Sequence, residues 1–214
     1  MNAIVFGPSG AGKTVNSTLV KTGKRGKNKL ICTDNSSIVL RNFKRDTLDI
    51  VNVGSTKDFI AEYRAAAQSG RYDTIIGDNL SDLTDMWILE LQDSGKFKDM
   101  RQAYAFVYNE LKRLTRESAM HDCNTIFTCW SELIEVPQPS GETVYRYVPK
   151  IREKIRDNIC GLMNVVAFVT TAEKDGKKRW YYVTAGSPSL MAKDQIACRA
   201  SCMPEDIFTP TTKK

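Results

Sequence analysis

Residues 7–14 read Gly-Pro-Ser-Gly-Ala-Gly-Lys-Thr, which matches the pattern G-x-x-x-x-G-K-[ST] at every fixed position. In this pattern, glycines let the backbone turn tightly and point N–H groups at phosphate oxygens. The lysine brings a positive charge to the β- and γ-phosphates, and the threonine offers a hydroxyl to Mg²⁺. The stretch therefore predicts a nucleotide-binding loop formed by Gly7, Pro8, Ser9, Gly10, Ala11, Gly12, Lys13, Thr14 and Val15.

The surroundings of this loop also fit the motif. Residues 2–6, Asn-Ala-Ile-Val-Phe, form a short and mostly apolar run suited to a buried strand. A helix expected over residues 13–21 would place the positive end of its dipole beneath the phosphates. Strand, glycine loop and helix are the arrangement that the motif requires, which favours it over a chance glycine-rich turn. ATP with Mg²⁺ is the expected cofactor pair.

A second stretch completes the expected metal site. Residues 72–77 are an apolar run that leads directly to Asp78. Many buried strands end in aspartate, so such a run is weak evidence by itself. After a matching glycine loop, an aspartate at this place in the chain predicts a ligand for Mg²⁺, bound directly or through water. Thr14 and Asp78 are therefore the candidate metal residues.

Composition is that of an ordinary globular protein. The chain has 214 residues, a length sufficient for one α/β domain with a sizeable core. Hydrophobic residues make up 42% of it and charged residues 26%, as in ordinary globular proteins. No apolar run approaches the ~20 residues of a membrane helix, and the start lacks the basic segment of a signal peptide. Six cysteines without a C-x-x-C pair and a single histidine predict reduced thiols in a cytoplasm rather than a zinc site.

Strand and helix patterns alternate along most of the chain. Further strands are expected over residues 30–33, 49–53, 124–130 and 164–170, and further helices over 55–69, 80–92, 99–120 and 149–161. Residues 132–136 and 143–148 could pair as a hairpin, and residues 179–184 return after a turn at 173–177. This order predicts an α/β fold of three layers, with a mainly parallel sheet and a C-terminal antiparallel hairpin. The domain is expected over residues 1–206, followed by a partly ordered tail over 207–214.

In order and spacing, these landmarks resemble the RecA-type core of P-loop ATPases. They include the glycine loop, the strands ending at Asp34, Asp78 and Trp130, the C-terminal hairpin, and Ala192-Lys193-Asp194. The chain looks most like phage-encoded nucleotide-binding proteins reduced to that core, some of which are single-strand annealing recombinases. The resemblance covers residues 2–206, but only the glycine loop and the strand before Asp78 are specific motifs.

The resemblance implies roles for several residues. Asp34 stands where the family usually carries the glutamate that activates the attacking water, and it is shorter by one methylene. Trp130 stands where a polar residue normally senses the γ-phosphate, so the sensor is either shifted to Ser131 or absent. Lys13, Asp34 and Lys193 are the catalytic residues that this resemblance implies.

Lys193 matches a basic residue that, in this family, reaches the γ-phosphate bound by a neighbouring subunit. The arginine often found two places later is replaced by Gln195. The alternative is that Lys193 is a surface lysine in a turn. If the match holds, the protein assembles into a homo-oligomeric ring or filament.

The family also binds DNA through the loops that follow the Asp78 and Trp130 strands. Cations interleaved with aromatic residues suit single-stranded DNA, because phosphates meet lysine or arginine while bases stack on rings. A plain hairpin with a mixed exposed face is an equally good interpretation of the second region. The candidate DNA-binding residues are Lys96, Phe97, Lys98, Tyr145, Arg146, Tyr147 and Lys150.

The leading expectation is an Mg²⁺-ATP-dependent, single-stranded-DNA-binding ATPase of phage recombination, annealing or replication. It would act in the cytoplasm of the bacterial host cell, with single-stranded DNA and a single-strand binding protein as partners and without a membrane. A net charge of +6 is compatible with a polyanionic partner. Two alternatives stay open: a small-molecule kinase of the nucleotide type, although Arg152 and Arg156 are the only nearby arginine pair, and a nucleotide-dependent loading or assembly factor without DNA binding.

Overall fold

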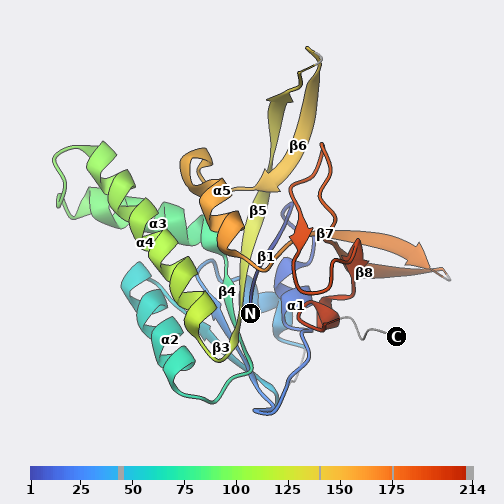
Figure 1. Ribbon diagram of the computed structural model, residues 1–214. Coiled ribbons are helices and arrows are strands. Elements are labelled where there is room, and N and C mark those ends of the chain that lie inside the picture. The colour runs from blue at the N-terminus through green and yellow to red at the C-terminus, as the bar shows by residue number, and fades with distance from the viewer. Residues whose placement is uncertain (43–45, 140, 175, 211–214) are drawn as a thin grey trace.

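The structure is a computed structural model that describes residues 1–42, 46–139, 141–174 and 176–210. Strands and helices alternate through the first two thirds of the chain (Figure 1). In chain order the elements are β1 (Asn2–Gly7), α1 (Lys13–Ser17), β2 (Asn28–Cys32), η1 (Ser36–Leu40), β3 (Leu48–Asn52), α2 (Thr56–Gln68), β4 (Thr74–Asp78), α3 (Leu80–Asp93), α4 (Met100–Met120), β5 (Asn124–Pro137), β6 (Thr143–Pro149), α5 (Glu153–Leu162), β7 (Val165–Lys174), β8 (Lys177–Val183), β9 (Lys193–Asp194), β10 (Ser201–Cys202) and η2 (Pro204–Asp206).

One sheet organises the molecule, with the strand order β10-β8-β7-β1-β5-β4-β2-β3. The strands from β7 to β3 in this order pair in parallel, while β8, β9 and β10 pair antiparallel at the C-terminal side. The strand β6 pairs antiparallel with the second half of β5. A mainly parallel sheet with C-terminal antiparallel strands is the predicted fold class.

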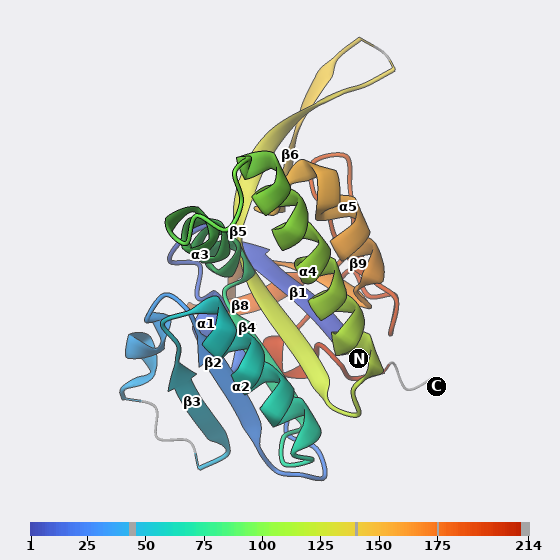
Figure 2. The ribbon, with the colours of Figure 1, turned by 90° about the vertical axis from the view of Figure 1, so that its left-hand side faces the viewer.

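The strands carry apolar residues on both faces because each face is covered. Ile4 and Phe6 of β1 belong to a core cluster shared with α2, α3, α4 and α5. Ala3 and Val5 belong to a second cluster on the opposite face. Figure 2 shows α2, α4 and α5 in front of the sheet and α1 behind it. Continuous apolar runs are typical of parallel strands buried in this way, and the result is a three-layer domain.

The first helix is shorter than the sequence predicts. It ends at Ser17, whereas the pattern favoured a helix over residues 13–21. The Thr18 hydroxyl donates to the Val15 carbonyl at 2.7 Å, and the Leu19 N–H donates to the Asn16 carbonyl at 3.0 Å. Serine, threonine and asparagine compete in this way with helical hydrogen bonds. A helix of five residues offers little dipole, so phosphate binding must depend on the loop itself.

The β5–β6 hairpin is longer than expected. β5 is one continuous strand from Asn124 to Pro137, where the sequence suggested a core strand and a separate hairpin flank. The hairpin projects from the body of the domain (Figures 1 and 2). The Lys150 N–H donates to the Trp130 carbonyl at 2.7 Å and extends the pairing, so α5 begins only at Glu153 rather than at residue 149.

The C-terminal segment packs further than the expected domain boundary at residue 206. Ile207 and Phe208 are buried in the cluster that also contains Val5 and Tyr182. Arg199 donates to the carbonyls of Asp206 and Ile207 and fixes the backbone there. The domain therefore extends at least to Phe208, while residues 211–214 of the predicted tail lie outside the described part of the chain.

Candidate functional site

The glycine loop lies at the carboxyl end of β1. Gly10 and Gly12 have φ values of 76° and 84°, in the left-handed region that favours glycine. Lys13 folds back over the loop, and its Nζ donates to the carbonyls of Gly7 at 3.0 Å and Pro8 at 2.9 Å. Burial lowers the pKa of Lys13, while the nearby Asp78 opposes that shift. These contacts hold a desolvated ammonium group inside the curve of the loop.

Asp78 joins the loop to the end of β4. The Thr14 hydroxyl donates to Asp78 Oδ2 at 2.6 Å, and the Ser36 hydroxyl donates to the same oxygen at 2.6 Å. The Thr128 hydroxyl donates to Asp78 Oδ1. Burial raises the pKa of Asp78, and the hydrogen bonds from the three hydroxyl groups oppose this shift. The structure thus brings the two candidate metal residues, Thr14 and Asp78, into direct contact.

These groups suit a magnesium ion. Thr14 and Asp78 offer the hydroxyl and carboxylate oxygens of a hard-cation site, with Ser36 and Thr128 beside them. Mg²⁺ usually keeps several waters and takes one or two carboxylates plus substrate phosphates. Among the described residues, no group of three or more histidine, cysteine, aspartate or glutamate side chains could hold a metal. Waters and the phosphates of a bound nucleotide would supply the remaining ligands.

Asp34 lies next to this site and is held there by Asn79. Asn79 Nδ2 donates to Asp34 Oδ2 at 2.6 Å, and Asn79 Oδ1 accepts the Asp82 N–H at 2.7 Å as the N-cap of α3. The other Asp34 oxygen accepts the Ser36 N–H at 3.0 Å. Asp34 is exposed, whereas Asn79 and Asp78 are buried. A solvent-facing carboxylate at this edge can reach a water, and its catalytic role stays a prediction.

The carboxyl end of the core part of β5 supplies a polar group, but not where the sequence suggested. Thr128, two residues before Trp130, points its hydroxyl at Asp78. Trp130 instead donates its backbone N–H to Ser81 Oγ at 3.1 Å, and Ser131 is half-buried opposite Pro149. Side chains alternate along a strand, so Thr128 and Trp130 lie on the same face. The polar residue that sequence reasoning missed at this strand end is Thr128, two residues before Trp130.

Lys193 lies away from the glycine loop of its own chain. On β9 it pairs with Val166 of β7, and its Nζ donates to the Gly161 carbonyl at 3.0 Å near the C-terminal end of α5. Gln195 Oε1 lies 3.5 Å from the same atom. Within one chain, Lys193 therefore caps a helix end. A contact with a nucleotide bound by a neighbouring subunit stays a prediction.

The first candidate DNA-binding region lies between α3 and α4. Phe97 is half-buried, and its ring packs against Phe106 with centroids 5.8 Å apart. Lys96 Nζ lies over both rings, 4.8 Å from the centroid of Phe106 and 5.6 Å from that of Phe97. Lys98 is exposed. The two lysines can contact phosphates. The ring of Phe97 packs mainly against Phe106 and has little surface left for stacking on a base.

The second candidate region is the β5–β6 hairpin. Tyr145 and Tyr147 share one face and are 56% and 43% exposed. Tyr147 also rests on Phe168, with ring centroids 5.4 Å apart. Arg146 points to the opposite face, where its Nε is buried. The hairpin therefore presents two tyrosines together and separates Arg146 from them.

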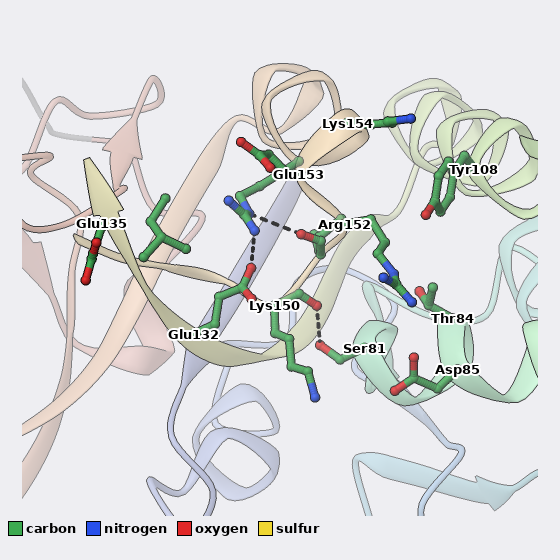
Figure 3. Close-up of a pocket in the computed structure, with 13 residues that line it drawn as sticks. Ser81, Thr84, Asp85, Tyr108, Glu132, Glu135, Lys150, Arg152, Glu153 and Lys154 are labelled. Carbon is green, nitrogen blue, oxygen red and sulfur yellow. Dashed lines mark hydrogen bonds and ion pairs between the residues drawn. The ribbon is translucent and has the colours of Figure 1, made fainter. Parts of the chain in front are cut away.

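A cavity of about 750 Å³ lies between the start of α3, the α4–α5 layer and the base of the hairpin. Figure 3 shows Lys150, Arg152, Glu132 and Asp85 around it, with charges of both signs. Ser81 Oγ donates to the Lys150 carbonyl at 2.9 Å in its wall. Lys150 Nζ lies over the Trp130 ring, 4.9 Å from the centroid. The cavity thus connects the metal-side start of α3 with the hairpin.

Comparisons with known proteins agree with this architecture. A KaiC-like protein of the hyperthermophilic archaeon Pyrococcus horikoshii OT3 superposes with a TM-score of 0.51 at 14% identity, covering 85% of this chain and 76% of that one. At that identity the match shows the fold alone, an α/β P-loop NTPase with a RecA-like core. No curated protein matches the chain.

No helix in the described part of the chain has the length and apolarity needed to cross a membrane. The family model described as "AAA domain" matches residues 1–196 and so includes the glycine loop, Asp78 and the strands between them. The chain therefore belongs to the AAA-domain family of P-loop proteins.

Proposed function

We propose that this protein is an Mg²⁺-dependent ATPase that binds single-stranded DNA and acts in phage recombination, annealing or replication. The observation that carries the ATPase part is the 2.6 Å hydrogen bond between Thr14 and Asp78. It joins the glycine loop to the neighbouring acidic strand end, which is the pair that holds Mg²⁺ in P-loop NTPases. Family membership supports the same chemistry.

Catalysis in this proposal is positioning plus stabilisation of charge. Lys13 lies within the curve of the loop and would shift from the Gly7 and Pro8 carbonyls to the β- and γ-phosphates. Bound Mg²⁺ would neutralise charge that develops on the phosphate oxygens. Asp34, fixed by Asn79, would orient the attacking water. In a ring or filament, Lys193 of a neighbouring subunit would add a further positive charge.

The DNA part of the proposal depends on the β5–β6 hairpin. Its exposed tyrosines can stack on bases, and Lys150 at its base can meet a phosphate. Ser81 provides a physical link to the nucleotide site, because its hydroxyl contacts both the Trp130 N–H and the Lys150 carbonyl. Ser81 lies three residues after Asp78, so a shift at the metal site can reach both strands at the base of the hairpin.

The kinase alternative receives less support. A phosphate clamp needs free guanidinium groups. Arg156 is buried, donates to the Pro149 and Ile151 carbonyls, and pairs with Glu132. Arg152 lies over the Tyr104 ring, 5.1 Å from the centroid. Arg156 is therefore not available to clamp a phosphate, and one arginine of the pair remains. The next experiment separates DNA binding from the other alternative, an assembly factor without DNA binding.

Replacing Tyr145 and Tyr147 together by alanine is expected to weaken single-stranded DNA binding at least about tenfold. Stacking contributes about 1–3 kcal/mol per base, and about 1.4 kcal/mol corresponds to a factor of ten. The dependence of affinity on salt should barely change, because no phosphate contact is lost. Fluorescence anisotropy with a labelled oligonucleotide over a salt series, with and without ATP, measures both quantities.

Lys96→Ala with Lys98→Ala is the matched comparison. If both lysines meet phosphates, this pair should lower the slope of log affinity against log salt by about 2. Glu142→Ala, at an exposed position near the hairpin tip, serves as the control that should change neither stacking nor cationic contacts. Unchanged affinity and slope in both multiple variants would contradict DNA binding by these regions and favour the assembly factor.

A further inference from the structure

The β7–β8 hairpin extends past the glycine loop. The last residue of β1 that pairs with β7 is Phe6, opposite Phe168, and β1 ends at Gly7. β7 continues to Lys174 before β8 returns. This overhanging part of the hairpin projects from the body beside α1 (Figure 1). Trp180, in the middle of β8, pairs with Thr171 in this overhang.

Trp180 is the residue of β8 that meets the loop. Its Nε1 and Cδ1 atoms lie 3.1 Å and 3.5 Å from the position that a Cβ would occupy on Gly12. Lys178 Nζ lies 6.0 Å from the centroid of the indole. Two residues on, Tyr182 is buried in the cluster against which Ala11 and Val15 pack, so this face of β8 is turned toward the loop and α1.

The indole of Trp180 remains 41% exposed although it touches the loop. Ligand pockets are commonly lined by aromatic side chains, and this partly uncovered ring lies beside the glycine loop. The edge of the ring that carries Nε1 lies next to Gly12, and the exposed part of the ring offers apolar surface to a flat ligand. A nucleobase is such a ligand, because every base has a π-face.

The orientation expected for a bound nucleotide also places its base near Trp180. Thr14 and Asp78 mark the metal side of the loop, and Asp78 belongs to β4, on the β5 side of β1. Thr14 and Asp78 would hold the Mg²⁺ that balances charge on the terminal phosphates, so the γ-phosphate would lie near that side. An extended nucleotide then directs its base away from β4. β7 and β8 lie on that opposite side of β1, with Trp180 at their edge.

We propose that Trp180 is the stacking platform for the base of the bound nucleoside triphosphate. This inference rests on the proposed nucleotide-binding function of the glycine loop. Stacking without hydrogen bonds to base edges recognises an aromatic base rather than one particular base. Purine triphosphates should therefore bind more tightly than pyrimidine triphosphates, with little difference between adenine and guanine.

The test compares ATP with inorganic tripolyphosphate, which carries the phosphates without a base. Affinities for both ligands with Mg²⁺ are measured by calorimetric titration of the wild-type chain, Trp180→Ala, Trp180→Phe and Tyr181→Ala. Trp180→Ala should weaken ATP binding about tenfold and change tripolyphosphate binding less than about twofold. Trp180→Phe should retain most of the affinity for ATP. Tyr181→Ala, which removes a ring from the opposite face of β8, should behave like the wild-type chain.

Each contrary result has a distinct meaning. Equal losses for ATP and tripolyphosphate in Trp180→Ala would overturn the platform, because the indole would then only shape the loop. Unchanged ATP binding in that variant, or equal affinity of the wild-type chain for both ligands, would overturn it as well. The last comparison needs no variant and so does not depend on the folding of Trp180→Ala. If the wild-type chain bound neither ligand, the phosphate loop itself would be wrong.

Discussion

Replacing Lys13 by alanine is expected to reduce ATP turnover by at least about a hundredfold. Removing one preorganised group that stabilises transition-state charge typically costs about 10² to 10³ in rate. Lys13 already lies inside the loop, with its ammonium group 3.0 Å and 2.9 Å from two loop carbonyls. Release of inorganic phosphate under saturating ATP and Mg²⁺ measures the effect.

The fold of the Lys13→Ala variant must be checked together with its activity. Lys13 is only 8% exposed, so its replacement also removes buried contacts around the loop. Its loss removes two hydrogen bonds from the loop and also removes the cost of a desolvated charge. Thermal unfolding provides the check, and Lys24→Ala at an exposed position is the control. Wild-type turnover in a folded Lys13→Ala variant would contradict the assignment of the loop.

Replacing Asp78 by asparagine is expected to weaken Mg²⁺-dependent nucleotide binding at least about tenfold and to abolish measurable turnover. The substitution keeps the shape of the side chain but removes the negative charge that Mg²⁺ requires. Thr14, Ser36 and Thr128 would then face a neutral amide. Nucleotide titrations with Mg²⁺ and with EDTA measure the difference. Equal Mg²⁺ dependence in the variant and the wild-type chain would exclude Asp78 as the metal-side residue.

The same substitution should change the pH dependence of stability. Burial raises the pKa of Asp78 from its ordinary value of 3.8. Between that value and the raised one, the folded state binds more protons than the unfolded state, so the free energy of unfolding falls as pH rises. In the metal-free protein, Asp78→Asn should remove this part of the decline. Adding Mg²⁺ with nucleotide should reduce this fall in the free energy of unfolding in the wild-type chain and not in Asp78→Asn.

Asp34→Asn is the matched comparison for Asp78→Asn. Asp34 is exposed and contacts Asn79 and the Ser36 N–H rather than Thr14. This variant should therefore keep Mg²⁺-dependent nucleotide binding and lose hydrolysis, if Asp34 orients the water. Normal hydrolysis would move the search for the carboxylate to Glu132, whose side chain is engaged by Arg156.

Local patterns predicted the parts of the fold that depend on local chemistry. The glycine loop is a complete motif, and the apolar runs of β1 and β4 follow from burial on both faces of a parallel sheet. A helix was predicted from residue 55, and α2 begins at Thr56 with Ser55 as its N-cap, whose hydroxyl accepts the Asp58 N–H at 3.1 Å. Each of these features depends on residues that are close together in the sequence.

Contacts between distant segments could not be predicted in this way. Ser36 and Thr128 reach Asp78 from segments 42 and 50 residues away. Trp180 meets Gly12 only because β8 returns beside β7 at the correct register. Phe97 was predicted as a DNA platform, yet Phe106 on α4 shares its packing. Pairing register and helix packing decide such contacts, and neither has a local signature in these segments.

We propose that the protein is an Mg²⁺-dependent ATPase whose activity responds to single-stranded DNA. The most direct test of this proposal is ATP turnover by the wild-type chain at fixed Mg²⁺, measured with and without single-stranded DNA. We expect turnover that requires Mg²⁺ and rises when single-stranded DNA is added, because Ser81, at the start of α3, contacts both strands at the base of the β5–β6 hairpin. Turnover that is absent, or that is the same with and without DNA, would contradict it.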